Sequence, residues 1–412
     1  MVKILFKNTF LFLLITLVSC GRSSGQNKEA VSTSKNKPQQ VVVGANRTSE
    51  YLPLLKDKKV GIVGNQSSVI FNSAISEGDK ATYTHLVDSL VTLKVNIKRV
   101  FAPEHGFRGN ADAGEHVKDG KDPKTGLNVI SLYGDNKKPK PEQLKDLDIL
   151  IFDIQDVGAR FYTYISSLHY VMEACAENDV KLIILDRPNP NGHYVDGPVL
   201  NPEFQSFVGV HPVPVVHGLT MGEYATMING EKWLENEVQC DLTVIKLDNY
   251  THQTEYSLPI KPSPNLPNDK AINLYPSLCF FEGTNVNAGR GTDNQFQVFG
   301  SPSLSKTYFD YNYIPESKDG AKSPKHLGET CYGRDLTKTE RLDHINLSWL
   351  IEAYNNTNSK SGFFNNFFSK LAGGNELQNQ IESGLSEKEI RASWQPGLEK
   401  FNKIRDKYLL YK

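Results

Sequence analysis

Short, almost continuously apolar segments alternate along this chain with segments whose apolar residues recur at helical spacing. The apolar segments cover residues 58–65, 97–103, 147–156 and 180–190, and the helical pattern covers residues 84–93 and 164–179. Strands that are apolar on both faces and alternate with amphipathic helices form parallel sheets covered by helices on both sides. We therefore predict a doubly wound, Rossmann-like α/β domain over residues 51–250.

Polar side chains gather directly after each of these predicted strands. "GNQSS" follows the first strand, "PEHGFRG" the second, "DIQDVGARFYTY" the third and "DRPNPNG" the fourth. In open α/β sheets, ligands bind outside the carboxyl ends of the strands, because the turns converge there on a crevice. The four polar segments together predict a functional site at that edge of the sheet.

The pattern changes beyond residue 250. The segments "KPSPNLPN", "FFEGTNVNAGRGTDNQF" and "FGSPS" are rich in Pro, Gly and Asn, which is typical of long loops, and helical periodicity returns near the carboxyl end. A chain of 412 residues also exceeds what one ordinary core supports. We predict a second, smaller α/β domain over residues 251–412, with loops that close a cleft against the first.

The first twenty residues have the layout of a bacterial lipoprotein signal peptide. Lys3 and Lys7 precede the apolar run "FLFLLITLV", and "LVSC" resembles a lipobox with Cys20 as the lipidated residue; the alternative is an ordinary signal peptide with a chance cysteine. Residues 21–50 are polar and predict a flexible tether. Because residue 22 is Arg and not Asp, we expect an exported protein with a membrane anchor in the outer membrane, facing the periplasm.

Composition and motifs exclude several classes of function. The formal net charge is -1 and no long basic block is present, so no nucleic-acid partner is expected. No glycine-rich phosphate loop, G-x-S-x-G elbow or H-E-x-x-H motif occurs, and we predict no cofactor. The cysteines after Cys20 form no C-x-x-C pair and are expected to be buried thiols. His105 and His116 flank Glu115, but a metal site would need further ligands that only the fold could supply, so none is predicted.

Carboxylates are the strongest candidates for chemistry. Glu104 and Glu115 follow one predicted strand and Asp156 follows another. Hydrolysis of a glycosidic bond needs a carboxyl group that gives a proton to the leaving oxygen, which such residues could supply. The alternative for Glu104 is an ion pair with Arg108 that only fixes the turn. For Glu223, which follows Thr220 by three residues, the alternative is a capping box at a helix start.

Nine segments carry a resemblance to a known family: "VGIVGNQSSV", "FAPEHGFRG", "SLYG", "FDIQDVGARFYTYISSL", "LDRPNPNG", "PVVHGLTMGEYA", "PSPNLPN", "FEGTNVNAGRGT" and "KYLLY". In this order they resemble the NamZ-type exo-β-N-acetylmuramidases of peptidoglycan recycling. The resemblance implies an active site in a cleft between a Rossmann-like domain and a smaller carboxyl-terminal domain. It also implies release of N-acetylmuramic acid from the non-reducing end of peptidoglycan fragments, with Glu104 as the leading catalytic carboxylate.

From this resemblance and from residue type we derive a candidate site. The catalytic candidates are Glu104, His105, Asp156 and Glu115. The substrate-binding candidates are Asn65, Gln66, Arg108, Arg160, Tyr162, Tyr164, Glu223, Asn265, Glu282 and Arg290. Either Arg160 or Arg290 could grip the lactyl carboxylate of the sugar, and Asn65, Gln66 or Asn265 its N-acetyl group. Two alternatives remain: a non-catalytic peptidoglycan-binding lipoprotein and a metal-dependent hydrolase on the same fold.

Overall fold

The computed structural model describes residues 40–72, 82–109 and 119–412, and Gln40–Lys412 form one compact unit. Within these residues, a central sheet of seven strands has the order β5-β6-β4-β1-β7-β8-β9. Its strands are β5 (Gly120–Lys121), β6 (Asn128–Ser131), β4 (Ile97–Ala102), β1 (Val60–Gly64), β7 (Ile149–Asp153), β8 (Lys181–Leu185) and β9 (Leu242–Ile245). β5 pairs antiparallel with β6, and the remaining pairs are parallel. From β6 to β9 this is the strand order 3-2-1-4-5-6 of a Rossmann-like fold, which confirms the predicted fold class.

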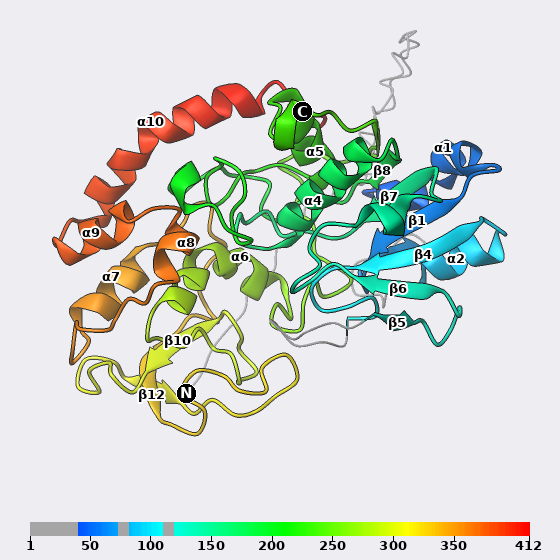
Figure 1. The fold of residues 1–412 in the computed structure, drawn as a ribbon. Coiled ribbons are helices and arrows are strands. Elements are labelled where there is room, and N and C mark those ends of the chain that lie inside the picture. Colours follow the sequence, from blue (N-terminus) through cyan, green and yellow to red (C-terminus); the bar gives the residue numbers. More distant parts are fainter. Residues whose placement is uncertain (1–39, 73–81, 110–118) are drawn as a thin grey trace, which may run out of the picture. The chain divides into compact units, whose positions relative to one another are not determined.

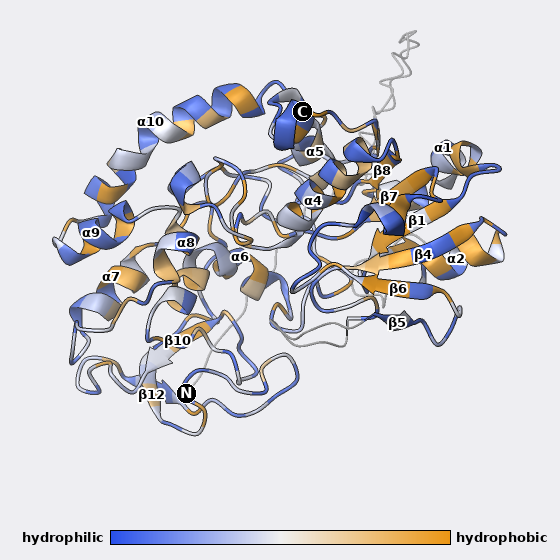
Figure 2. Cartoon of the chain, viewed as in Figure 1, coloured by the Kyte–Doolittle hydropathy of each residue, from blue (hydrophilic) through white to orange (hydrophobic). Residues whose placement is uncertain are grey.

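Helices and one antiparallel pair of strands lie before or between these strands (Figure 1). The helices are α1 (Thr48–Tyr51), α2 (Leu86–Thr92), α3 (Pro141–Leu144), α4 (Tyr164–Glu177) and α5 (Met221–Gly230), and the pair is β2 (Val69–Phe71) with β3 (Tyr83–His85). The strands are apolar on both faces because each face is covered. Leu150 and Phe152 of β7 pack in one core with helix α4, whereas Ile149 and Ile151 pack in a second core with α2. Figure 2 shows the resulting hydrophobic strands in the sheet.

The carboxyl-terminal half is smaller and mixes helices with a separate three-stranded antiparallel sheet, as predicted. Its elements are α6 (Asp269–Leu278), β10 (Val298–Ser301), β11 (Tyr311–Tyr313), β12 (Cys331–Asp335), α7 (Ser348–Asn355), α8 (Phe368–Ala372), α9 (Glu376–Glu382) and α10 (Glu387–Arg405). Phe280, Phe281 and Phe299 of this half belong to the same hydrophobic core as Phe152 of β7. The two halves are therefore held together by shared apolar packing.

Segments from both ends of the described chain pack on the Rossmann-like half. Val43 and Ala45, which lie within the predicted tether, are buried in its core. Near the carboxyl end, the Tyr411 hydroxyl donates to Asp186 at 2.6 Å and accepts from the Leu247 amide at 3.0 Å. Residues within the predicted tether are thus part of the packed structure, and the domain limits given above remain predictions.

Two further observations concern the thiols and the length of the helices. Cys175, Cys240, Cys279 and Cys331 are buried and free, as expected. Among the residues that the structure describes, no helix combines the length and the apolar character needed to cross a membrane.

Candidate active site

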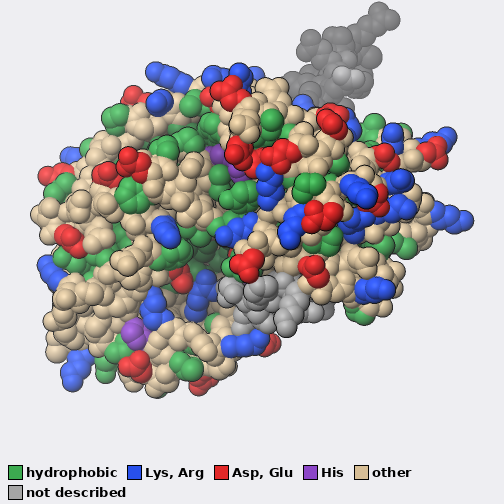
Figure 3. All heavy atoms as spheres, viewed as in Figure 1, with side chains coloured by type: hydrophobic (Ala, Val, Ile, Leu, Met, Phe, Trp, Pro, Cys, Tyr) green, Lys and Arg blue, Asp and Glu red, His purple; other side chains and the backbone are tan. Residues whose placement is uncertain are grey.

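A cavity of about 660 Å³ lies where the carboxyl ends of β4, β6 and β7 face loops of the carboxyl-terminal half. The side chains that matter most for its chemistry are Glu104, His105, Tyr133, Thr163, Tyr162, Tyr164, Asn265, Glu282 and Arg290. On the face drawn in Figure 3, hydrophobic side chains gather in the hollowed centre. The predicted site edge is therefore the edge that carries this cavity.

Glu104 lies two residues beyond β4, and hydrogen bonds from neighbouring strand ends fix its carboxylate. The hydroxyl of Thr163, in the segment after β7, donates to Glu104 Oε2 at 2.8 Å. The hydroxyl of Tyr133, just after β6, also donates to this carboxylate. Burial raises the pKa of Tyr133, and the negative charge of Glu104 raises it further. A carboxyl group is thus held in one orientation within the cavity.

Arg108 does not pair with Glu104. Its guanidinium instead binds Asp88 Oδ1 at 3.0 Å and Asp122 Oδ2 at 2.8 Å, and it lies over the ring of Phe107. Burial opposes ionisation of Asp122, but the hydrogen bonds from Arg108 outweigh it and lower the pKa of Asp122 to about 2. The alternative interpretation of Glu104 as the partner of Arg108 is therefore wrong. Arg108 fixes the loop and does not line the cavity.

His105 follows Glu104 directly and lines the same cavity. Its side chain is buried, and its backbone has φ 70°, a left-handed conformation that residues other than glycine rarely adopt. Such strain costs roughly 1–3 kcal/mol and persists only where the surrounding structure enforces it. The turn after β4 is therefore shaped to present the two neighbouring side chains of Glu104 and His105 to the cavity.

Tyr162 and Tyr164 form the floor beside Glu104. Their rings meet edge to face with centroids 4.9 Å apart. Asn65 donates from Nδ2 to the Tyr164 hydroxyl at 2.9 Å, while its Oδ1 accepts from the amide and hydroxyl of Ser67. Asn65 is completely buried and does not line the cavity, so it acts on the site through Tyr164.

The opposite wall comes from loops of the carboxyl-terminal half. Arg290 Nε donates to Glu282 Oε1 at 2.9 Å. Burial raises the pKa of Glu282, but the charges of Arg290 and Lys325 outweigh burial, so this pKa lies below its usual value. Asn265 Nδ2 donates to the Gly320 carbonyl at 2.7 Å, which leaves its buried Oδ1 without a hydrogen-bond partner among the described residues. This wall therefore offers one acceptor and one guanidinium to a ligand.

Several predicted binding residues lie outside the cavity because the fold uses their polar groups. Gln66 donates from Nε2 to the carbonyls of Lys261 and Pro262. Arg160 is wholly buried and donates to the carbonyls of Pro198, Val213 and Leu371 at 2.7, 2.7 and 2.8 Å. Burial lowers the pKa of Arg160 to about 9. Because Leu371 lines the cavity from the carboxyl-terminal half, Arg160 ties the two walls together from behind.

Glu223 forms the capping box that was its alternative interpretation. Its Oε2 accepts from the Thr220 amide at 2.9 Å, and Thr220 Oγ1 accepts from the Glu223 amide at 3.3 Å. Glu223 Oε1 also contacts His252 Nε2 at 3.0 Å and accepts from the Leu410 amide at 2.8 Å. Glu223 is thus fully committed to starting α5 and to fastening the carboxyl-terminal segment.

Asp156 lies behind the cavity wall and is not part of its lining. Its Oδ2 accepts from the Gly158 amide at 2.7 Å, whereas its buried Oδ1 has no hydrogen-bond partner among the described residues. Burial raises the pKa of Asp156 to about 7, although the Gly158 and Val157 amides oppose this shift. When ionised, Asp156 raises the pKa of Tyr162 and Tyr164 through its negative charge. Because Asp156 does not line the cavity, it influences these tyrosines of the wall and does not contact a ligand.

Two predicted residues, Glu115 and Cys20, lie outside the described residues. Within the described part, the carboxylates of Glu173, Glu177 and Glu235 approach closely enough to hold a metal ion. Lys138 already binds Glu173 at 2.7 Å and Glu177 at 2.8 Å, so an ammonium group compensates this acidic group. This acidic group is also distinct from His105, His116 and Glu115, which were considered for a metal site on the sequence alone.

Sequence reasoning missed Tyr133 and Thr163, the two hydroxyl groups that hold Glu104. Both occur in segments that carried the family resemblance, "SLYG" and "FYTY". It also missed the aromatic lining contributed by Phe161, Tyr275 and Phe296. Only the position of Tyr133 directly after an apolar strand could have indicated its role, because its partner Glu104 is far away in sequence.

The strand ends that carry the site are braced by a buried ion pair. Arg187, after β8, binds both carboxylate oxygens of Asp153 at the end of β7, at 2.6 and 2.9 Å, and donates to the Val69 carbonyl at 2.9 Å. Ser67 Oγ accepts from the Gln155 amide at 2.9 Å. These contacts join the segments after β1, β7 and β8 into one rigid support.

Comparisons with known proteins agree with this architecture. Residues 60–270 match the family model "Exo-beta-N-acetylmuramidase NamZ, N-terminal", and residues 273–411 match "Exo-beta-N-acetylmuramidase NamZ, C-terminal". The chain is 38% identical over 381 residues to the peptidoglycan beta-N-acetylmuramidase NamZ of Bacillus subtilis, covering 88% of this chain and 89% of that protein.

Two solved structures of DUF1343 family proteins from Bacteroides fragilis are also similar. One has 47% identity and a TM-score of 0.82, covering 91% of this chain and 99% of that chain. The other has 27% identity and a TM-score of 0.74, covering 90% and 99%. Similarity of this extent spans both walls of the cavity.

Proposed function

The chain belongs to the exo-β-N-acetylmuramidase NamZ family, and we propose that it removes N-acetylmuramic acid from the non-reducing end of peptidoglycan fragments by hydrolysis, with Glu104 as the proton donor. The observation that carries the role of Glu104 is its orientation by Thr163 and Tyr133 inside a cavity of about 660 Å³. Cavities of roughly 300–1,000 Å³ are typical of sites for small ligands.

In this mechanism, protonated Glu104 gives its proton to the glycosidic oxygen while the bond between that oxygen and carbon 1 of the muramic acid breaks. The rest of the fragment leaves with a new hydroxyl group. Water adds its hydroxyl to carbon 1, and its remaining proton restores Glu104. Thr163 and Tyr133 keep the carboxyl group directed at the leaving oxygen.

The opposite wall is suited to the substituents that distinguish this sugar. Asn265 Oδ1 can accept the N–H of the N-acetyl group, because its Nδ2 is fixed on the Gly320 carbonyl. The guanidinium of Arg290 keeps its terminal nitrogens for the lactyl carboxylate, since Glu282 binds only Nε. His105, Tyr162 and Tyr164 complete the enclosure around the ring.

The test uses the disaccharide in which N-acetylmuramic acid is β-linked to N-acetylglucosamine, with release of the first sugar measured by chromatography. Glu104→Gln should lower kcat by about 100- to 10,000-fold while the disaccharide still binds. Glu399→Gln, at an exposed position of α10, is the matched control and should retain full activity. A wild-type protein that binds the disaccharide without cleaving it would instead identify a peptidoglycan-binding protein, and loss of activity with EDTA a metal-dependent hydrolase.

We further propose that the enzyme is exported and anchored through a lipid on Cys20 in the outer membrane, facing the periplasm. The charged residues Lys3 and Lys7, the apolar run and "LVSC" support this proposal. A clickable palmitate analogue should label the wild type and not Cys20→Ser. Equal labelling of both proteins would contradict the anchor.

A further inference from the structure

A second cavity, of about 740 Å³, adjoins the candidate active site. Phe207 and Lys137 line both cavities, so these two side chains form the boundary between them. The remainder of the second cavity includes Tyr170, Trp233 and Glu235. Its size is comparable to that of the first cavity, and no residue in it was a candidate from the sequence.

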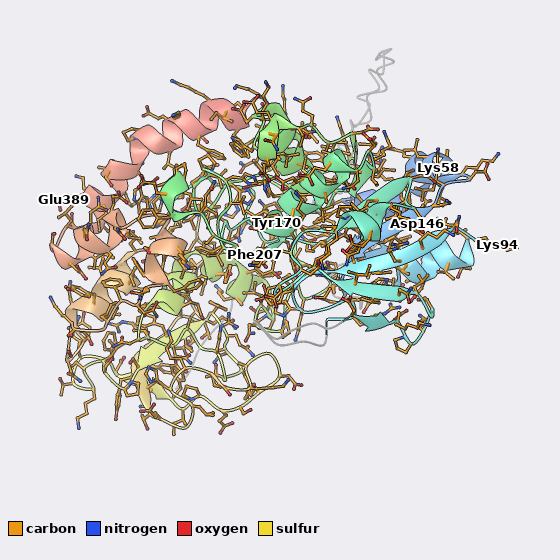
Figure 4. The ribbon with its side chains drawn as sticks, viewed as in Figure 1. Lys58, Lys94, Asp146, Tyr170, Phe207 and Glu389 are labelled. Carbon is orange, nitrogen blue, oxygen red and sulfur yellow. The ribbon has the colours of Figure 1, made fainter. Side chains whose placement is uncertain are left out.

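A series of aromatic rings leads from Glu104 to this second cavity. The Tyr133 hydroxyl is hydrogen-bonded to Glu104, and the Tyr133 ring contacts Phe207 with centroids 6.0 Å apart. Phe207 stacks on Tyr170 at 6.3 Å with an interplanar angle of 16°. Figure 4 shows Tyr170 and Phe207 near one another, away from the outer edges of the sheet. The proton donor is therefore connected through Tyr133 to the ring that separates the cavities.

The lining of the second cavity has the character of a saccharide site. Tyr170, Phe207 and Trp233 offer aromatic surface, against which the apolar face of a pyranose packs. Trp233 is itself held by a stacked contact with His211, with centroids 4.9 Å apart. Around these rings, Gln205 and Glu235 supply groups that can hydrogen-bond to sugar hydroxyls.

The second cavity is lined by one lysine, Lys137, and by two carboxylates, of which Glu173 is compensated by Lys138. The Lys137 ammonium lies 5.1 Å from the centroid of the Phe207 ring. It has no carboxylate partner among the described residues, whereas the neighbouring Lys138 is engaged by Glu173 and Glu177. Lys137 is thus a cation that remains available to the carboxylates of muramic acid residues further along the strand.

We propose that the second cavity binds the departing part of the glycan, the N-acetylglucosamine and following sugars, while the terminal muramic acid occupies the first. This assignment rests on the proposed function. Glu104, reached from Phe207 through Tyr133, then lies at the bond to be cleaved between the two cavities. An enzyme built in this way prefers longer glycan strands to small substrates.

The experiment compares kcat/KM on three peptide-free substrates: an aryl β-N-acetylmuraminide, the disaccharide, and a tetrasaccharide with two such disaccharide repeats. The wild type should favour the tetrasaccharide over the disaccharide by about tenfold, which corresponds to roughly 1.4 kcal/mol. Trp233→Ala and Tyr170→Ala should each abolish this preference and leave the aryl substrate within about twofold of wild type. The two variants should affect the substrates differently because the tetrasaccharide contacts the second cavity, whereas the aryl substrate does not reach it.

Trp349→Ala, at a partly buried tryptophan of α7, is the matched control and should keep the wild-type preference. Thermal melting establishes that each variant is folded. If Trp233→Ala does not fold, Tyr170→Ala alone tests the assignment. Equal loss on all three substrates, or an unchanged preference in both variants, would overturn the assignment. A wild-type protein that cleaves none of the three substrates would refute the proposed function and this assignment with it. That result differs from the two outcomes above, which would overturn the assignment alone.

Discussion

The two walls of the candidate active site are built in different ways. At the strand ends, the carboxylate of Glu104 is held by its neighbours, because Thr163 and Tyr133 both donate to it. The wall from the carboxyl-terminal loops keeps hydrogen-bonding atoms unused, namely Asn265 Oδ1 and the terminal nitrogens of Arg290, among the described residues. A reacting group benefits from fixed orientation, whereas recognition needs unsatisfied groups that a ligand completes. The difference assigns chemistry to the first wall and recognition to the second.

The largest effect is expected at Arg160, which joins the walls from behind. Arg160→Met leaves the carbonyls of Pro198 and Leu371 without a donor, and each such loss costs roughly 1–3 kcal/mol, whereas the Val213 carbonyl keeps the Leu200 amide. The free energy of unfolding in urea should fall by about 3–5 kcal/mol. Arg290→Met should lower the free energy of unfolding by less than about 1 kcal/mol. A stable Arg160→Met protein with weak substrate binding would contradict this division of roles.

A second effect concerns Asp156 and the pH dependence of stability. Folded Asp156 keeps its proton up to about pH 7, whereas an unfolded aspartate loses it near pH 4. Between these values the folded state binds more protons, so the free energy of unfolding falls as the pH rises and levels off above pH 7.

Asp156→Asn should remove this decline, which amounts to at most about 4 kcal/mol. Urea denaturation of both proteins at pH 4.5 and pH 8 measures it. The stability of the variant relative to wild type should be greater at the higher pH. The same difference at both values would show that Asp156 ionises as it does in the unfolded chain.

Recognition by the loop wall is tested at Arg290. Arg290→Gln should raise KM for the muramic acid disaccharide by about tenfold, the value of one charge-assisted hydrogen bond of roughly 1.5 kcal/mol, with little change in kcat. The corresponding substrate without the lactyl group should show no such increase. Equal effects on both substrates would place the lactyl carboxylate elsewhere in the cavity.

The smallest effect is expected at Thr163. Thr163→Val removes the 2.8 Å hydrogen bond to Glu104 and keeps the shape of the side chain, so kcat should fall by roughly fivefold, or about 1 kcal/mol, while KM stays unchanged. Thr226→Val, which removes a bond to the Gly222 carbonyl within α5, should not affect kcat. A change in KM alone at Thr163 would indicate that its hydroxyl binds the substrate.

The sequence predicted the central sheet and the edge that carries the site, because continuous apolar strands and the polar segments after them are local patterns. Local patterns also placed Glu104, His105 and Tyr164 near one another at strand ends. They could not show which way each side chain points. Arg160 and Asn65 follow strands as Glu104 does, yet backbone carbonyls and a neighbouring hydroxyl use their polar groups.

Contacts between residues far apart in sequence could not be predicted either, because local patterns do not show which side chains meet. The partners of Arg108 are Asp88 in α2 and Asp122 before β6, and neither spacing nor periodicity connects them. Glu282 and Arg290 reach the cavity only because their loop turns back through Gly289, whose φ of +80° suits glycine. The second cavity had no sequence signal at all, since its lining comes from the segment between β6 and α3, from α4, from the loop between β8 and α5 and from the segment after α5, which meet only after folding.

The leaving-group dependence of Glu104→Gln tests the central claim most directly. A dinitrophenolate leaves without a proton, whereas the hydroxyl of N-acetylglucosamine must be protonated as it departs. With the variant, kcat/KM should fall by about 100- to 10,000-fold on the disaccharide and by less than about tenfold on dinitrophenyl β-N-acetylmuraminide. Equal losses on the two substrates would contradict the assignment of Glu104 as proton donor.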